Sequence, residues 1–179
     1  MSAPRQMAEG SGDAAASSRI LLTGDLDTDL AGQVGVQLMA HDASSDGGVD
    51  LVIRSERGTI QAALGVMDTI DAMGVPVTGI GLGQVEGPAL GVLAICHRRQ
   101  AGPSSRLRLV APSLTASGTA KDLAEQVQMG ARDLERFTAR VARATGQPAE
   151  KIEIDLRQGR YFDPEEAIAY HLVDRIWGK

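Results

Sequence analysis

Apolar residues along this chain alternate between short continuous runs and stretches spaced as on one face of a helix. The short runs predict strands over residues 20–24, 50–54, 77–82 and 107–111. Between them, apolar positions with helical spacing predict helices across residues 30–38, 60–70 and 90–95. Strands that alternate with helices favour an α/β fold with a mostly parallel sheet of repeated βα units, and its working crevice would lie beyond the C-terminal strand ends.

The longest expected element is a helix from Thr119 to about Arg143. Asp122 stands three residues after Thr119, as in a capping box, and Gly146 would end the helix. Such a helix would be about 37 Å long, so we expect it to project from the domain and meet a neighbour. Its apolar stripe consists of Leu123, Val127, Ala131, Leu134, Phe137 and Val141.

The residue composition between these elements predicts a loop and the starts of two further helices. Residues 41–48 are expected to form a loop, and Pro148 and Asp163 are expected to begin two short helices. The basic residues His97, Arg98 and Arg99 follow the helix at 90–95, where positive charge would stabilise a helix C-terminus.

Composition narrows the classes of protein. The 179 residues suit one domain over residues 19–179, preceded by an Ala/Ser/Gly-rich tail, residues 1–18, that we expect to be disordered. A net charge of −5 gives no basis for binding nucleic acid, and no apolar run reaches the roughly 20 residues of a membrane span. The single cysteine, Cys96, fits a reducing cytoplasm and is expected to pack as a small buried hydrophobe. The Arg-over-Lys bias with heavy Ala and Gly use suggests a bacterial source.

The sequence does not match the common motifs for catalysis or cofactor binding. The glycines at 79–87 do not form G-x-G-x-x-G, and no Walker lysine follows them. His41, His97 and His171 lie far apart without metal-ligand spacing, so we expect neither metal nor cofactor. The serines fall in turns, and none has a visible histidine base.

The stretch from Val77 to Cys96 reads as a buried strand that turns directly into an apolar helix. A corner of this kind directs backbone N–H groups at one point, and hydrolases often place a nucleophile there. Here the corner carries Val85 and Glu86, with Pro88 just beyond. The scaffold is therefore that of an enzyme, whereas a valine cannot act as a nucleophile.

Five segments resemble the proteolytic subunit of the Clp protease (ClpP). Residues 51–58 are similar to its strand ending in Asn-Ser-Pro-Gly-Gly, and residues 67–70 to its Tyr-Asp-Thr-Met helix. Residues 81–87 stand where Gly-x-Ala-Ala-Ser-Met-Gly is expected. Residues 145–148 and 164–174 match the family's C-terminal part.

This likeness extends over residues 20–176 and implies a ClpP/crotonase-like fold with a long projecting handle helix. It implies a Ser-His-Asp triad whose serine position is Val85, whose histidine position is Val110 and whose aspartate position is Gly159. A small shift in alignment would put Asp155 or Asp163 at the third position instead. With Val85, Val110 and Gly159 in place, no triad is intact, and we expect a non-catalytic member of a serine endopeptidase family.

The oxyanion-hole equivalents implied by the resemblance are Gly58 and Glu86, with Arg57 as an altered neighbour. A carboxylate at position 86 would oppose the negative charge that develops in an acyl-transfer transition state. We hypothesise that Arg57 and Glu86 form an ion pair across the vacated site.

The family assembles into heptameric rings that stack into tetradecamers, and its handle helix interleaves between rings. Residues 114–118 and the helix after Thr119 stand in those places, so the resemblance implies assembly with copies of itself or with active paralogues. Asp50, Val52 and Ala72 occupy positions where the family's unfoldase-binding pocket has aromatic residues, so direct contact with an AAA+ unfoldase is not favoured.

The leading interpretation is therefore a structural or regulatory pseudo-protease subunit in Clp-type proteolysis. Two alternatives remain open from the sequence. One is an active serine peptidase subunit with an unrecognised nucleophile. The other is an acyl-CoA-binding enzyme of the related crotonase fold, which also uses backbone N–H groups as an oxyanion hole.

Overall fold

The computed structural model describes residues 18–112 and 118–179 of the chain. The expected tail lies outside these residues except for Ser18, which begins the first strand. Most of the expected segment 114–118 also lies outside them. The strands are β1 (Ser18–Thr23), β2 (Val49–Ser55), β3 (Val77–Glu86), β4 (Arg98–Ala101), β5 (Arg106–Leu109), β6 (Arg160–Phe162) and β7 (Arg175–Ile176). The helices are α1 (Thr28–Ser44), α2 (Ile60–Ala72), α3 (Pro88–Ile95), α4 (Ala120–Thr145), α5 (Ala149–Gln158) and α6 (Pro164–Ala169).

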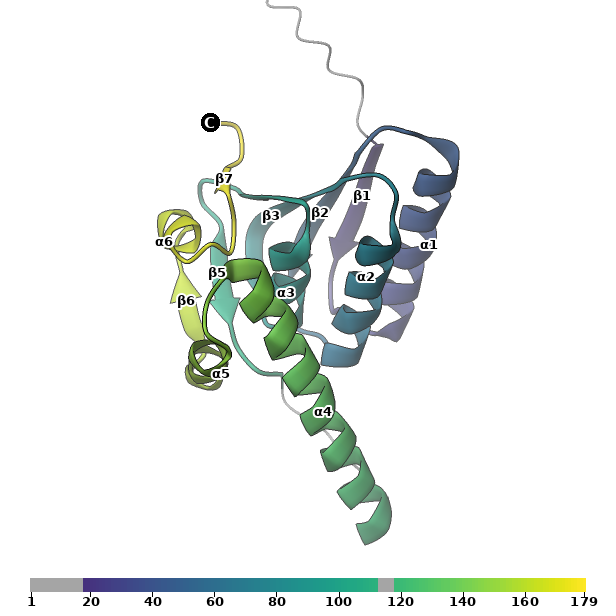
Figure 1. The fold of residues 1–179 in the computed structure, drawn as a ribbon, viewed down its shortest axis with the longest axis vertical. Helices are drawn as coiled ribbons and strands as arrows, with labels where there is room; N and C mark the ends of the chain where they lie inside the picture. Colours follow the sequence, from purple (N-terminus) through teal and green to yellow (C-terminus); the bar gives the residue numbers. More distant parts are fainter. Residues whose placement is uncertain (1–17, 113–117) are drawn as a thin grey trace, which may run out of the picture.

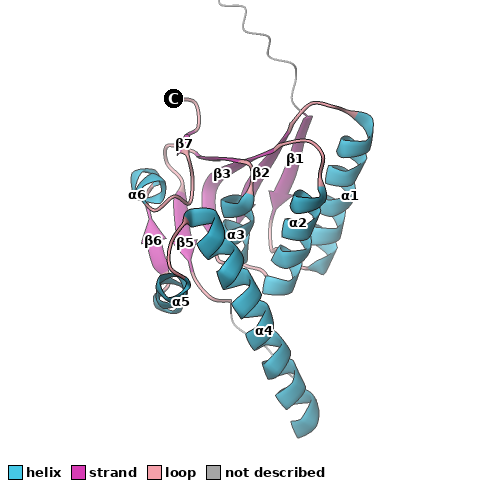
Figure 2. Ribbon diagram, in the orientation of Figure 1, coloured by secondary structure: helices cyan, strands magenta, loops and turns pink. Residues whose placement is uncertain are grey.

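The strands form one sheet in the order β1-β2-β3-β4-β7, all parallel, and the second half of β3 also pairs with β5. Among the strands of the described residues, only β6, which pairs with β5, runs antiparallel (Figure 2). Helices α1, α2 and α3 lie side by side along the sheet, whereas α5 and α6 lie beside β5 and β6 (Figure 1). The expected α/β fold with a mostly parallel sheet is confirmed.

Helix α3 packs unusually close to β3 because the strand carries glycines where the helix touches it. A Cβ atom added to Gly79 would lie 2.8 Å from Sγ of Cys96, and one added to Gly81 would lie 2.9 Å from Cδ2 of Leu93. Both distances are too short for any larger residue. Cys96 is buried as expected, and burial raises the pKa of its thiol to about 12.

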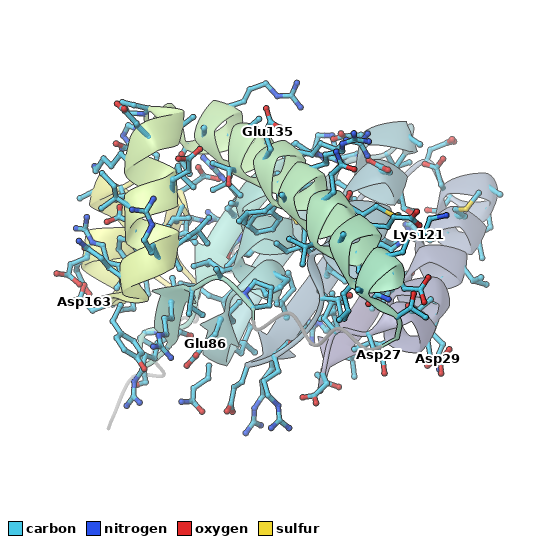
Figure 3. All side chains as sticks on the ribbon, turned by 90° about the horizontal axis from the view of Figure 1, so that it is seen from below. Asp27, Asp29, Glu86, Lys121, Glu135 and Asp163 are labelled. Atoms are coloured by element: carbon cyan, nitrogen blue, oxygen red, sulfur yellow. The ribbon has the colours of Figure 1, made fainter. Side chains whose placement is uncertain are left out.

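Helix α4 confirms the expected long helix. Thr119 and Asp122 form the capping box, and Gly146 ends the helix in the left-handed conformation. Its C-terminal half is anchored: Phe137 is buried against Gly91 of α3, where an added Cβ would lie 2.3 Å from the phenyl ring. The N-terminal half, which carries Lys121, projects beyond the domain (Figures 1 and 3). The expected apolar stripe is therefore buried in the core at the C-terminal end of α4 and exposed to solvent at its N-terminal end.

Two local expectations are wrong. Helix α1 continues through residue 44, so only residues 45–48 of the expected loop connect it to β2. Residues 98–101 form strand β4 rather than the end of a helix. This strand is short and polar, and its backbone pairs with both β3 and β7, so its conformation depends on neighbours distant in the sequence.

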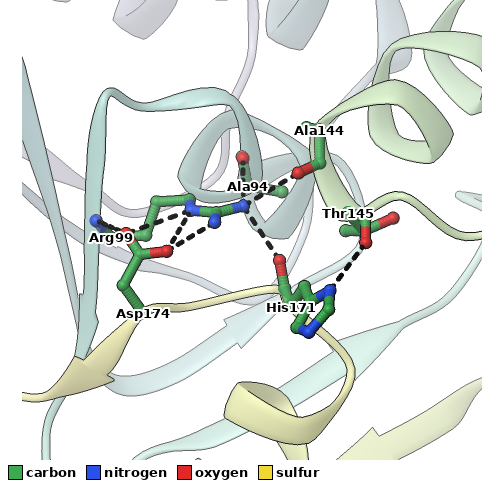
Figure 4. A network of polar contacts seen from close by, with 6 residues as sticks. All are labelled: Ala94, Arg99, Ala144, Thr145, His171 and Asp174. Carbon is green, nitrogen blue, oxygen red and sulfur yellow. Dashed lines mark hydrogen bonds and ion pairs between the residues drawn. The ribbon is translucent and has the colours of Figure 1, made fainter.

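Arg99 nevertheless donates hydrogen bonds to carbonyl groups at the C-terminal ends of helices, as its positive charge suggested. From β4, its Nη1 donates to the carbonyl oxygens of Ala94 in α3 (3.3 Å), Ala144 in α4 (3.1 Å) and His171 (2.8 Å) (Figure 4). Asp174 balances the charge by accepting hydrogen bonds from the backbone N–H and the side chain of Arg99. One side chain therefore joins the ends of two helices to the C-terminal segment.

No helix among the described residues is both long enough and apolar enough to span a lipid bilayer.

Replacing Arg99 with methionine is expected to lower the free energy of unfolding by about 2–4 kcal/mol, because three carbonyl groups lose a hydrogen-bond donor and the Asp174 carboxylate loses the guanidinium. Urea denaturation measures the change. Arg98→Met is the matched control: its side chain is exposed, and we expect a change of about 0.5 kcal/mol or less. Equal losses in the two variants would contradict the role given to Arg99.

The same variants should respond differently to acid. Burial alone would raise the pKa of Asp174, but the hydrogen bonds and positive charge of Arg99 outweigh burial and hold it below its ordinary value. A depressed folded-state pKa contributes stability that is present above about pH 4 and lost as pH falls further. The stability difference between wild type and Arg99→Met should therefore narrow below that pH.

Candidate functional site

The corner between β3 and α3 is built as the sequence suggested, although the strand extends further than expected. β3 continues through Glu86, and α3 begins at Pro88. Gly87 makes the turn with φ 55°, and its N–H donates to the carbonyl of Arg108 at 2.9 Å. A Cβ at Gly87 would lie 3.1 Å from the carbonyl oxygen of Val110, so both the backbone conformation and the close approach require glycine here.

The three positions implied for the triad lie in or directly beside the neighbouring strands β3, β5 and β6. Val85 is fully buried in β3 and pairs with Leu107 of β5. Val110 directly follows β5. Gly159 directly precedes β6, which pairs antiparallel with β5. The fold therefore brings together three segments that are up to 74 residues apart, and none of the three positions carries a group that can transfer a proton.

Arg108, which sequence reasoning missed, lies between these segments. Its Nη1 is 3.4 Å from Oε2 of Glu86, and its Nε donates to the carbonyl of Gly159 at 3.3 Å. Its guanidinium carbon lies 4.6 Å from the centre of the Tyr161 ring, a cation–π distance. The usable signal was the Arg-Leu-Arg-Leu alternation over residues 106–109, which predicts a strand with arginines on one face.

Glu86 lies at the C-terminal end of β3 (Figure 3) and is only 9% exposed, so its carboxylate depends on Arg108 for charge compensation. Gly159 leaves room for this arginine. A Cβ at Gly159 would lie 2.9 Å from Nη2 of Arg108, and the residue has φ 68°, a conformation that favours glycine. Any residue larger than glycine at position 159 would therefore force Arg108 to leave its observed position.

The hypothesised ion pair between Arg57 and Glu86 is wrong. The Arg57 side chain is 79% exposed and pairs with Asp25, with Nη2 and Oδ2 3.2 Å apart. Its backbone is held by two hydrogen bonds to its carbonyl, from the hydroxyl of Ser55 and the N–H of Leu26. These bonds fix the turn after β2 so that the guanidinium faces solvent beside β1.

Gly58, implied as an oxyanion-hole residue, forms a parallel bridge with Leu26. A Cβ at Gly58 would lie 2.6 Å from the carbonyl oxygen of Leu26, so packing alone already requires glycine at this position. Its place in an oxyanion hole stays a prediction.

Both alternative aspartates have structural partners. Asp155 is buried, accepts a hydrogen bond from the hydroxyl of Tyr170 at 2.6 Å, and lies 3.4 Å from Nη1 of Arg160. Burial, with that hydrogen bond, raises the pKa of Tyr170 well above its ordinary value. Asp163 caps α6 by accepting from the N–H of Glu166.

Each histidine contacts a backbone group. His41 Nε2 lies 2.9 Å from the carbonyl of Gly47, and His171 Nδ1 lies 3.3 Å from the carbonyl of Thr145. His97 Nδ1 accepts from the N–H of Val77 at 3.2 Å. Within residues 18–112 and 118–179, no three or more His, Cys, Asp or Glu side chains are grouped so as to hold a metal ion.

Arg108→Met is expected to lower the free energy of unfolding by about 1–3 kcal/mol, because it leaves the Glu86 carboxylate buried without a partner. Glu86→Gln combined with Arg108→Met should recover part of that loss, since the uncompensated charge is then removed. Chemical denaturation of the two single variants and the double variant measures the coupling.

Arg106→Met is the control, since Arg106 is exposed on the same strand. Strictly additive effects of Glu86→Gln and Arg108→Met would show that the two side chains do not interact in solution.

Comparison with known proteins identifies similar sequences. A family model described as Clp protease matches residues 6–179. ATP-dependent Clp protease proteolytic subunit 3 of Rhizobium etli is 33% identical over 162 residues, covering 89% of this chain and 84% of the relative. ATP-dependent Clp protease proteolytic subunit 2 of Rhodococcus jostii is 30% identical over 164 residues, covering 88% and 83%. The proteolytic subunit of Chlorokybus atmophyticus is 33% identical over 162 residues, covering 88% and 72%.

Proposed function

Because the chain belongs to the Clp protease family, we propose that it is a proteolytic-subunit homologue that assembles into rings without cleaving peptides itself. Its role would be structural or regulatory, in Clp-type proteolysis in the cytoplasm. The observation that carries this proposal is the Glu86–Arg108 ion pair beside the buried Val85.

The chemistry of the corner supports the absence of cleavage. Acyl transfer needs a nucleophile with an adjacent base, and the positions implied for both hold valines, Val85 and Val110. It also develops negative charge near the backbone N–H groups of the corner. The Glu86 carboxylate there would raise the energy of that charge rather than lower it.

The projecting half of α4 supports assembly. Leu123 and Val127 lie one turn apart on this half and are 36% and 56% exposed. An apolar stripe that continues past the core is suited to packing against another subunit. We propose that the partners are copies of this chain or active paralogues, in heptameric or tetradecameric rings.

The purified full-length chain is expected to show no labelling by a fluorophosphonate probe and no cleavage of short fluorogenic peptides above background. An active Clp peptidase run in parallel shows that the assay works. Val85→Ser is the informative variant: it restores a hydroxyl but no base, so it should also remain unlabelled. Labelling mapped to any serine of the wild-type chain would overturn the pseudo-protease proposal.

Native mass measurement at micromolar concentration is expected to show an oligomer. Replacing Leu123 and Val127 together with aspartate should weaken association by about tenfold or more, because the stripe on α4 loses its apolar contact. Ile154→Asp is the control: this side chain is 45% exposed on α5, away from α4's projecting half. A wild-type monomer, alone and when mixed with an active paralogue, would contradict ring assembly.

A further inference from the structure

The side chain of Arg108 lies across three strands at the corner. Strand register places Glu86 of β3, Arg108 of β5 and Tyr161 of β6 side by side. The guanidinium contacts both neighbours, since it pairs with Glu86 and lies over the Tyr161 ring. The Arg108 side chain is 31% exposed, so its charge acts in surroundings that are partly shielded from solvent.

The same register relates positions 110 and 159. Strands β5 and β6 pair antiparallel, with Leu109 opposite Arg160. Continuing this pairing by one residue sets Val110 opposite Gly159. Residues directly opposite each other on antiparallel strands have Cβ atoms about 4.5–5.5 Å apart. A histidine at position 110 and an acid at position 159 would therefore be neighbours.

Arg108 lies closer still to position 159. A Cβ atom added to Gly159 would lie 2.9 Å from Nη2 of Arg108 and 3.3 Å from its Nε. A carboxylate on that Cβ would meet the guanidinium after a small shift of the arginine side chain. The two hydrogen bonds that Arg108 makes, to Oε2 of Glu86 and to the carbonyl of Gly159, are long at 3.4 and 3.3 Å. A bidentate pair with a carboxylate is shorter and stronger.

We infer that Arg108 is a second block on peptide cleavage at this corner, separate from the missing nucleophile and base, because its guanidinium would capture an acid placed at position 159. This inference rests on the proposed function. In a serine–histidine–acid triad, the acid orients the imidazole and stabilises its protonated form. An acid held by Arg108 can do neither, and the positive charge beside the imidazole opposes its protonation.

The first test restores the triad with and without Arg108. The quadruple variant Val85→Ser/Val110→His/Gly159→Asp/Glu86→Gln also removes the corner carboxylate, so that Arg108 is the only difference when Arg108→Met is added. The measurement is the rate at which a fluorophosphonate probe labels the full-length chain. We expect this rate to rise about a hundredfold or more with Arg108→Met.

Two further substitutions in the quadruple variant separate charge from side-chain volume. Arg108→Lys keeps a positive charge, so labelling should stay slow. Arg106→Met removes an exposed arginine two residues away on β5 and should not raise the labelling rate. Equal rates with and without Arg108→Met, whether both fast or both undetectable, would overturn the inference.

The second test measures the capture itself and does not require activity. Aspartate and asparagine have nearly the same shape, and both tolerate the left-handed conformation of Gly159, where φ is 68°. In the chain carrying Glu86→Gln, the urea midpoint of Gly159→Asp should exceed that of Gly159→Asn at neutral pH, because only the aspartate pairs with Arg108. Adding Arg108→Met should remove the difference. Equal midpoints with Arg108 present would contradict the capture.

The wild-type chain is labelled in parallel with these variants. Its labelling would contradict the proposed function, whereas the inference depends only on the differences that Arg108→Met makes to the labelling rate and to the urea midpoint. Thermal unfolding shows whether each compared protein is folded. Where the quadruple variant does not fold, the comparison of Gly159→Asp with Gly159→Asn decides.

Discussion

The close packing of α3 between β3 and α4 is the constraint on which the rest of the structure depends. Glycines 79 and 81 let the helix lie directly on the strand, and Gly91 on its other side admits the ring of Phe137. From Pro88 to Ala94 every residue of α3 is buried. A helix without a polar face cannot be displaced without exposing apolar surface, so the corner that precedes it is held rigidly.

Because the corner is held rigidly, its chemistry depends on the side chains that it carries. Gly87 makes the turn from β3 into α3 with a positive φ. Beside it, the side chain of Arg108 contacts both the carboxylate of Glu86 and the ring of Tyr161. Gly159 belongs to this arrangement too, because any larger residue would collide with Arg108. The Glu86 carboxylate, the Arg108 guanidinium and the glycine at 159 therefore depend on one another.

Arg99 connects the C-terminal end of α3 to the C-terminal end of α4. Its guanidinium binds the carbonyl ends of α3 and α4 together, and Asp174 keeps it neutralised (Figure 4). The base of α4 is also fixed to α2, where Arg140 pairs with Asp68 and Asp71. The exposed half of α4 therefore projects from a firmly anchored base, and this geometry suits a helix that contacts other subunits.

Sequence alone determined the α/β class, the long capped helix after Thr119 and the strand-to-helix corner at Val85, because these depend on local periodicity and capping chemistry. Tertiary structure decided the rest. Strand β4 forms because β3 and β7 flank it, which no local pattern shows. The partner of Glu86 is Arg108 rather than Arg57, because strand register sets Arg108 directly opposite Glu86 while the turn after β2 directs Arg57 to Asp25. Residue types were visible in the sequence, but which charges meet depends on register and turn geometry, and these are set by the packing of distant segments.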